Sequence, residues 1–158
     1  MTDELKAYIR LETAVAAAFN FFINGMVAAL VYHKADYVPT DAISIIIDLV
    51  LTCLLMCVLC AYLCRASLKR TKTARILEGG GALLRCFGRL LRYPLLYGFV
   101  LGIIAAIVLS AATVPLFAWL GVNMLPFGWY VVLKVLFAAL LGGGVTRLTL
   151  YAGMYASK

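Results

Sequence analysis

Four stretches of mostly apolar residues, separated by short polar segments, constrain this chain more than any other feature of its sequence. The hydrocarbon core of a bilayer is about 30 Å thick, and a helix needs roughly 20 apolar residues to cross it. The four stretches cover residues about 13–32, 42–64, 93–119 and 127–147. We therefore expect an all-α integral membrane protein in which four transmembrane helices form a bundle.

The composition supports this assignment and leaves no room for a second domain. Of the 158 residues, 65% are hydrophobic and only 13% are charged, which is too little charge to cover a water-soluble globule. We expect residues 1–158 to form a single four-span domain. Residues 1–12 mix acidic and basic side chains and lack the basic start of a signal peptide, so we expect the first span to be retained.

The basic residues predict how the chain is oriented. The linker at 65–92 holds most of them, whereas the first loop on the other side has only Lys34 and the second has none. The positive-inside rule therefore places the linker and both termini in the cytoplasm. The linker then joins two helical hairpins in parallel orientation. A short chain of this kind suits the plasma membrane of a bacterium, the bacterial inner membrane.

Part of the linker has the pattern of an amphipathic helix. Arg85, Arg89 and Arg92 recur at helical spacing, and leucines and Phe87 occupy the opposite face. We expect this helix to lie on the inner leaflet with its arginines on anionic lipid headgroups. A regulatory or partner-binding segment is the alternative. The net charge of +7 is explained by this lipid contact, so we expect no nucleic-acid partner.

Two opposite charges interrupt the apolar stretches at matched depth. Asp48 follows Pro39 by nine residues, and Lys134 follows Pro126 by eight. The matched placement hints that the two halves are copies of one another. A charge at this depth is costly, so it normally faces a partner, the bundle interior or water. Three hypotheses follow: an ion pair that locks two helices together, a polar pathway for an ion or charged solute, or a lysine that extends outward to the interface.

Two asparagines mark one face of the first span. Asn20 and Asn24 are four residues apart, which places them on the same side of a helix. Amide groups in hydrocarbon need hydrogen-bond partners, so they either bond to neighbouring helices or line a polar cavity. Ser44 and Thr52 of the second span are candidates to join such a cavity.

A stripe of cysteines runs along the second span, at positions 53, 57, 60 and 64. The spacing of Cys57 and Cys60 is that of thiol redox motifs, but the chain offers no second cysteine pair in an outer loop to relay electrons. Small, polarizable packing residues are the favoured interpretation, ahead of redox work and metal binding. We expect no metal site and no cofactor.

Glycines in the last two spans permit close helix contact. Gly98 and Gly102 form one such step, and the run 142–144 forms another. The contact is either within one chain or at the seam of a homo-oligomer.

Function is less constrained than fold. We expect a transporter or channel for an ion or small polar solute, acting as an oligomer or within a larger complex, with Asn20, Asn24, Asp48 and Lys134 around a polar route. A non-catalytic accessory, regulatory or immunity subunit is the alternative, and an intramembrane thiol redox protein is a weaker one. No nucleophile and base, metal triad or phosphate loop stands at either interface, so we do not expect an enzyme.

Overall fold

Four long helices dominate the computed structural model, which describes residues 2–71 and 81–155. The helices are α1 (Asp3–Tyr32), α2 (Ala42–Arg70), α4 (Pro94–Leu120) and α5 (Phe127–Met154). Each is long and apolar enough to cross a membrane. The prediction of an all-helical fold with four helices long and apolar enough to span a membrane is therefore confirmed. A fifth, short helix, α3 (Ala82–Leu90), comes directly before α4.

Most of the long helices extend beyond the apolar stretches that predicted them. α1 starts at Asp3, where Thr2 caps it by accepting from the Leu5 amide, and α2 continues to Arg70. These extra turns are polar, so hydropathy alone does not detect them. Residues 72–80 of the expected linker lie outside the described residues.

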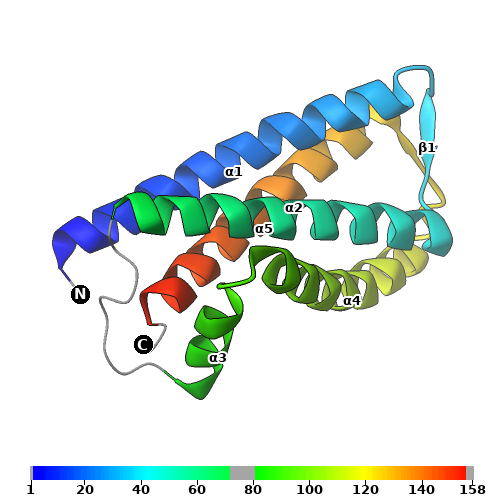
Figure 1. Ribbon diagram of the computed structural model, residues 1–158. Coiled ribbons are helices and arrows are strands. Elements are labelled where there is room, and N and C mark those ends of the chain that lie inside the picture. The colour runs from blue at the N-terminus through cyan, green and yellow to red at the C-terminus, as the bar shows by residue number, and fades with distance from the viewer. Residues whose placement is uncertain (1, 72–80, 156–158) are drawn as a thin grey trace.

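Two short strands join the loops at one end of the bundle, which we call the ladder end (Figure 1). β1 (Tyr37–Pro39) pairs antiparallel with β2 (Met124–Pro126), with Val38 opposite Leu125. The Thr40 amide donates to Asn123 and the Phe127 amide donates to Asp36, at 2.9 and 3.0 Å. In an antiparallel pair, hydrogen-bonded positions alternate with positions that make no ladder bond. Both prolines therefore occupy positions where a missing amide costs no bond.

The packing of the long helices differs from two separate hairpins. α1 packs most extensively against α5 and α2 against α4, while α2 also contacts α5. Helices adjacent in sequence, α1 with α2 and α4 with α5, make at most sparse backbone contact within the described residues. Each helix therefore packs against one from the other half of the chain. The sequence expectation of two helical hairpins is not confirmed by these contacts, because the most extensive packing joins the two halves.

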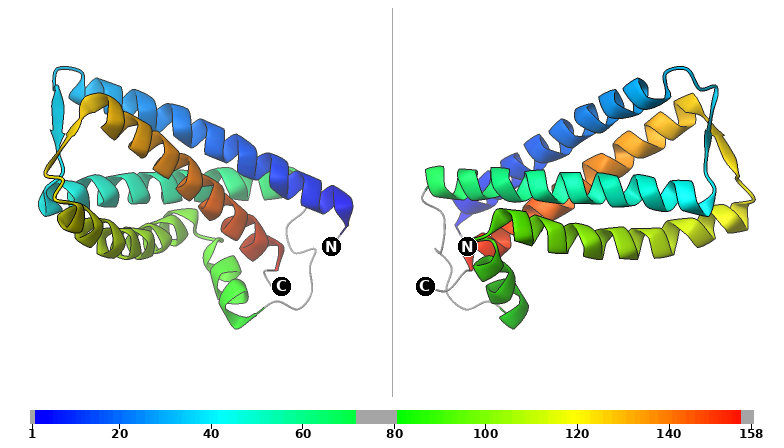
Figure 2. Two further views of the ribbon diagram at one scale, coloured as in Figure 1. Left: turned by 180° about the vertical axis from the view of Figure 1, so that it is seen from behind. Right: turned by 45° about the vertical axis from the view of Figure 1, so that its right-hand side comes forward.

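The two halves of the chain are arranged alike. α1 and α4 both run toward the ladder end, and α2 and α5 return to the end where the chain termini lie, which we call the terminal end (Figures 1 and 2). If the two halves are exchanged, α1 takes the place of α4, α2 that of α5, and β1 that of β2. The α1–α5 contact then becomes the α4–α2 contact. This pattern is that of a two-fold axis through the ladder and the α2–α5 contact, as in parallel membrane repeats.

Helix α3 packs against the terminal end of the bundle. The Phe87 ring lies edge-on to Tyr97, with ring centroids 5.9 Å apart, and Leu91 is buried. Much of the apolar face that the sequence assigned to the inner leaflet therefore contacts protein, although Leu83 remains exposed. The three arginines of this segment, Arg85, Arg89 and Arg92, are exposed. Their contact with lipid headgroups stays a prediction.

Candidate functional site

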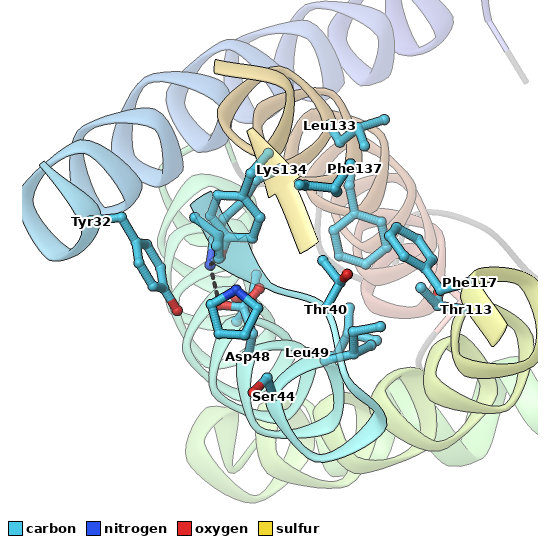
Figure 3. Close-up of a pocket in the computed structure, with 16 residues that line it drawn as sticks. Tyr32, Thr40, Ser44, Asp48, Leu49, Thr113, Phe117, Leu133, Lys134 and Phe137 are labelled. Carbon is cyan, nitrogen blue, oxygen red and sulfur yellow. Dashed lines mark hydrogen bonds and ion pairs between the residues drawn. The ribbon is translucent and has the colours of Figure 1, made fainter. Parts of the chain in front are cut away.

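The two intramembrane charges meet near the ladder end of the bundle. Asp48 lies in the second turn of α2 and Lys134 in the second turn of α5, and the Lys134 ammonium donates to Asp48 Oδ1 (Figure 3). The side chain of Lys134 is 8% exposed and that of Asp48 is 30% exposed. The opposite charges at matched depth are thus brought into direct contact, and the carboxylate is the more accessible partner.

Two tyrosines surround the lysine. Tyr130, one helical turn before Lys134, places its hydroxyl 3.1 Å from Lys134 Nζ, and its ring centroid lies 5.4 Å from the same atom. Tyr32, at the end of α1, packs edge-on against Tyr130 with centroids 5.1 Å apart. A cation near an aromatic face is stabilised by the ring quadrupole. The ammonium group therefore has a second partner besides Asp48.

A cavity of about 210 Å³ lies beside the ion pair, beneath the β ladder. Its walls come from the ladder and from α1, α2, α4 and α5 (Figure 3). Apolar side chains and aromatic rings make up most of its surface, and Asp48 and Lys134 are the charged residues that line it. The lining residues are Tyr32, Val38, Pro39, Thr40, Ser44, Ile45, Asp48, Leu49, Thr52, Thr113, Phe117, Leu125, Tyr130, Leu133, Lys134 and Phe137.

Several hydroxyl groups near the cavity are engaged locally. Thr40 donates to the Val122 carbonyl at 2.9 Å, which fastens the ladder, and Ser44 donates to Asp41 at 2.7 Å. Asp41 caps α2 by accepting from the Ser44 amide at 3.2 Å. These bonds hold the pKa of Asp41 below its ordinary value, so this carboxylate stays charged outside the cavity.

The two asparagines lie elsewhere in the bundle. Both are buried, and neither lines the cavity. The Asn20 amide donates to Ala16 O at 2.8 Å and to Cys60 Sγ at 3.7 Å, while Asn24 donates to Asn20 O at 3.0 Å and to Met56 Sδ at 3.5 Å. The asparagines therefore connect α1 to α2 through sulfur atoms. The structure separates them from the charged pair.

The cysteine stripe is part of the packed core. Cys53, Cys57, Cys60 and Cys64 are buried free thiols, and Cys64 donates weakly to Thr146 O at 3.9 Å. Within residues 2–71 and 81–155, no group of three or more histidine, cysteine or acidic side chains is placed to hold a metal ion. The thiols of Cys60 and Cys64 contact α1 and α5, while Gly98 and Gly102 of α4 lie close to the backbone at Cys57 and Cys53.

The glycines of the last two spans make contacts inside the chain. A β-carbon at Gly98 would lie 2.8 Å from the Val58 nitrogen, and one at Gly142 would lie 2.7 Å from Asn20 Cγ. Gly144, by contrast, has open space where a β-carbon would be. Gly98 therefore sets the separation of α2 and α4, and Gly142 leaves room for the Asn20 side chain.

The sequence anticipated part of this site and missed the rest. Asp48 and Lys134 stood out because charge is rare in a span, whereas tyrosines are common near the ends of spans and Tyr32 and Tyr130 therefore do not stand out. The spacing of Tyr130 and Lys134 by four residues is the signal that could have identified the tyrosine.

No protein family, curated protein or solved structure matches this chain.

Proposed function

We propose that this protein is a small, non-enzymatic membrane transporter whose substrate binds in the cavity beneath the β ladder. The observation that carries the proposal is the position of the Asp48–Lys134 pair, which borders a cavity instead of lying wholly inside packed helices. Retaining charge at this depth is costly. Binding of a substrate by the Asp48–Lys134 pair explains why the protein retains charge there despite its cost in free energy.

The chemistry of the walls favours an amphipathic organic cation as the substrate. The rings of Tyr32, Phe117, Tyr130 and Phe137 line the cavity and can pack against an apolar or cationic body. Asp48 is the negatively charged residue among the lining residues, and it is more accessible than its partner. We infer that the cationic group of the substrate binds this carboxylate.

Exchange between two cations provides a route for binding and release. When the substrate cation contacts Asp48, it displaces the Lys134 ammonium from the carboxylate. The lysine remains beside the hydroxyl and ring of Tyr130, so it is not left without a polar partner in a low-dielectric site. On release of the substrate, the ammonium returns to Asp48. The ion pair therefore forms again whenever the site holds no substrate.

Flux measurements test this proposal. Proteoliposomes holding the purified protein should take up radiolabelled benzyltrimethylammonium, a permanently charged aromatic cation, faster than protein-free liposomes do when the interior is negative. Asp48→Asn should reduce uptake to the protein-free level, because an amide cannot neutralise the bound cation. The control is Asp41→Asn, which changes a carboxylate outside the cavity and keeps a good helix cap.

Absence of uptake by the wild-type protein would overturn the assignment of an organic cation. Unchanged uptake in Asp48→Asn would remove Asp48 from the mechanism, and loss of uptake in Asp41→Asn as well would indicate general damage instead of a specific effect.

The orientation and membrane also belong to the proposal. Exposed basic residues gather toward the terminal end, on α1, α2 and α3, whereas the loops at the ladder end carry only Lys34. We propose that the terminal end faces the cytoplasm of a bacterium and that the cavity lies near the outer side of the inner membrane. The wide apolar surface of the long helices is compatible with a homo-oligomer or a larger membrane complex.

A non-catalytic accessory subunit is the second candidate. It is favoured by the internal bonding of the polar groups, since Lys134 contacts Asp48 directly and the amides of Asn20 and Asn24 bond within the chain. In that case the charged pair only joins α2 to α5, and replacing both partners by apolar residues should leave the protein functional in its complex.

A further inference from the structure

A second cavity, of about 330 Å³, lies between α1 and α5 toward the terminal end. Its lining residues come from the N-terminal part of α1 and the C-terminal part of α5, and none of them lines the proposed transport site. We call it the basic groove. The residues that line it are Lys6, Ile9, Arg10, Thr13, Ala14, Ala17, Arg147 and Tyr151.

The charge of the basic groove is uniformly positive. Lys6 and Arg10 of α1 and Arg147 of α5 line it, and none of its lining residues is acidic. Lys6 has an exposed partner in Asp3, at 2.9 Å. Within the described residues, neither arginine takes part in an ion pair. Cations gathered around one hollow without a carboxylate favour the entry of an anion.

The nearby acid on α1 is committed to a different partner. Glu12 accepts a hydrogen bond from the Ser67 hydroxyl of α2 at 2.8 Å, and the Ser67 and Tyr8 hydroxyls lie 2.7 Å apart. This polar chain runs to α2, and Glu12 is not among the residues that line the basic groove. Arg147 is steadied by Tyr151, whose ring centroid is 6.0 Å from its guanidinium carbon.

The floor of the basic groove is apolar. Ile9, Ala14 and Ala17 line it together with Thr13, whose buried hydroxyl oxygen has no hydrogen-bond partner among the described residues. Leu11 and Val15 of the same helix are exposed large hydrophobic side chains, as expected where a helix faces lipid. The basic groove thus combines cationic side chains with an apolar wall on α1.

We propose that the basic groove binds one anionic glycerophospholipid, with its phosphate between Arg10 and Arg147 and an acyl chain along Ala14 and Ala17. Basic pockets between transmembrane helices are suited to this class of lipid. The apolar floor distinguishes a phospholipid from a soluble phosphate, which would gain nothing from Ala14 and Ala17. This site is distinct from the exposed arginines of α3 and does not depend on the proposed transport activity.

Native mass spectrometry of the full chain in detergent tests the proposal. The probes are phosphatidylglycerol and phosphatidylcholine of equal chain length, each titrated into wild-type protein and into Arg10→Gln/Arg147→Gln. We expect one preferentially bound phosphatidylglycerol per wild-type chain, and an affinity about thirtyfold lower in the double variant, which corresponds to about 1 kcal/mol for each of the two basic side chains. Phosphatidylcholine should bind weakly to both proteins.

The control carries the same loss of charge at another place. Lys69→Gln/Arg70→Gln changes two exposed basic residues at the end of α2, and it should keep the wild-type affinity for phosphatidylglycerol in the groove. An equal loss in both double variants would show that general surface charge holds the lipid and would overturn the proposal. So would equal binding of the two lipids, or displacement of bound lipid by millimolar inorganic phosphate. A fall confined to the groove variant supports it.

Discussion

Replacing Asp48 with leucine is expected to lower the free energy of unfolding by about 3 kcal/mol, because it leaves the Lys134 ammonium buried without a counter-charge. The Tyr130 hydroxyl remains as a partner, which places the expected loss at the lower end of the range for broken buried pairs. Equilibrium unfolding in mixed micelles, monitored by near-ultraviolet circular dichroism of the aromatic residues, measures the change.

The double variant separates the contribution of the ion pair to stability from that of ordinary packing. Asp48→Leu/Lys134→Met removes both charges, and we expect it to recover about 2 kcal/mol of the loss, since an uncharged pair of similar size needs no partner. The exposed pair is the control: Lys6→Met removes the contact with Asp3 and should change stability by less than about 0.5 kcal/mol. Additive effects of Asp48→Leu and Lys134→Met would contradict the direct contact between them.

Replacing Gly98 with alanine is expected to destabilise the protein by about 3 kcal/mol, the upper range for overpacked sites. The added methyl group would lie 2.8 Å from the Val58 nitrogen and 2.9 Å from the Cys57 oxygen. Both are backbone atoms of α2, which cannot rotate aside as a side chain can. The α2–α4 contact must therefore open. The same unfolding measurement in mixed micelles reports the loss.

Gly144→Ala is the matched control, because it makes the same chemical change where no atom lies within 4 Å. Alanine favours the helix over glycine by up to about 1 kcal/mol, so this variant should be as stable as the wild-type protein or slightly more stable. Equal stability of the two alanine variants would show that Gly98 does not lie against α2.

Hydropathy and charge predicted the elements of the fold well. The four spans follow from the length of the apolar stretches. The cap of α2 is Asp41, and aspartate is one of the residue types preferred at this position. Pro94 lies in the first turn of α4, where its missing amide costs nothing. These features are local, and a single sequence contains them.

The pairing of the helices could not be predicted in the same way. A hydrophobic face is equally satisfied by lipid and by any neighbouring helix, so the composition of α1 does not indicate α5 as its partner. Each β strand has only three residues, too few for an alternating pattern, and Tyr37-Val38-Pro39 therefore resembled an ordinary turn.

The candidate site was predicted in part for a related reason. Opposite charges attract whichever helices carry them, so a contact between Asp48 and Lys134 was a natural hypothesis. Amides have more choices of partner. Asn20 and Asn24 donate to carbonyl and sulfur acceptors away from the cavity. The spacing of the two asparagines did not distinguish this arrangement from a polar route.

The two halves of the chain pack together through the α1–α5 and α2–α4 contacts, and this arrangement brings Asp48 to Lys134 beneath the ladder. A disulfide between α1 and α5 tests it most directly. A β-carbon at Gly143 would lie 3.6 Å from that of Ala17, within the range for disulfides. Ala17→Cys/Gly143→Cys, oxidised in membranes, should keep its two fragments joined after cleavage at a protease site inserted in 72–80, whereas Ala17→Cys/Gly144→Cys should not. Separation of the fragments in both variants would contradict the pairing of α1 with α5.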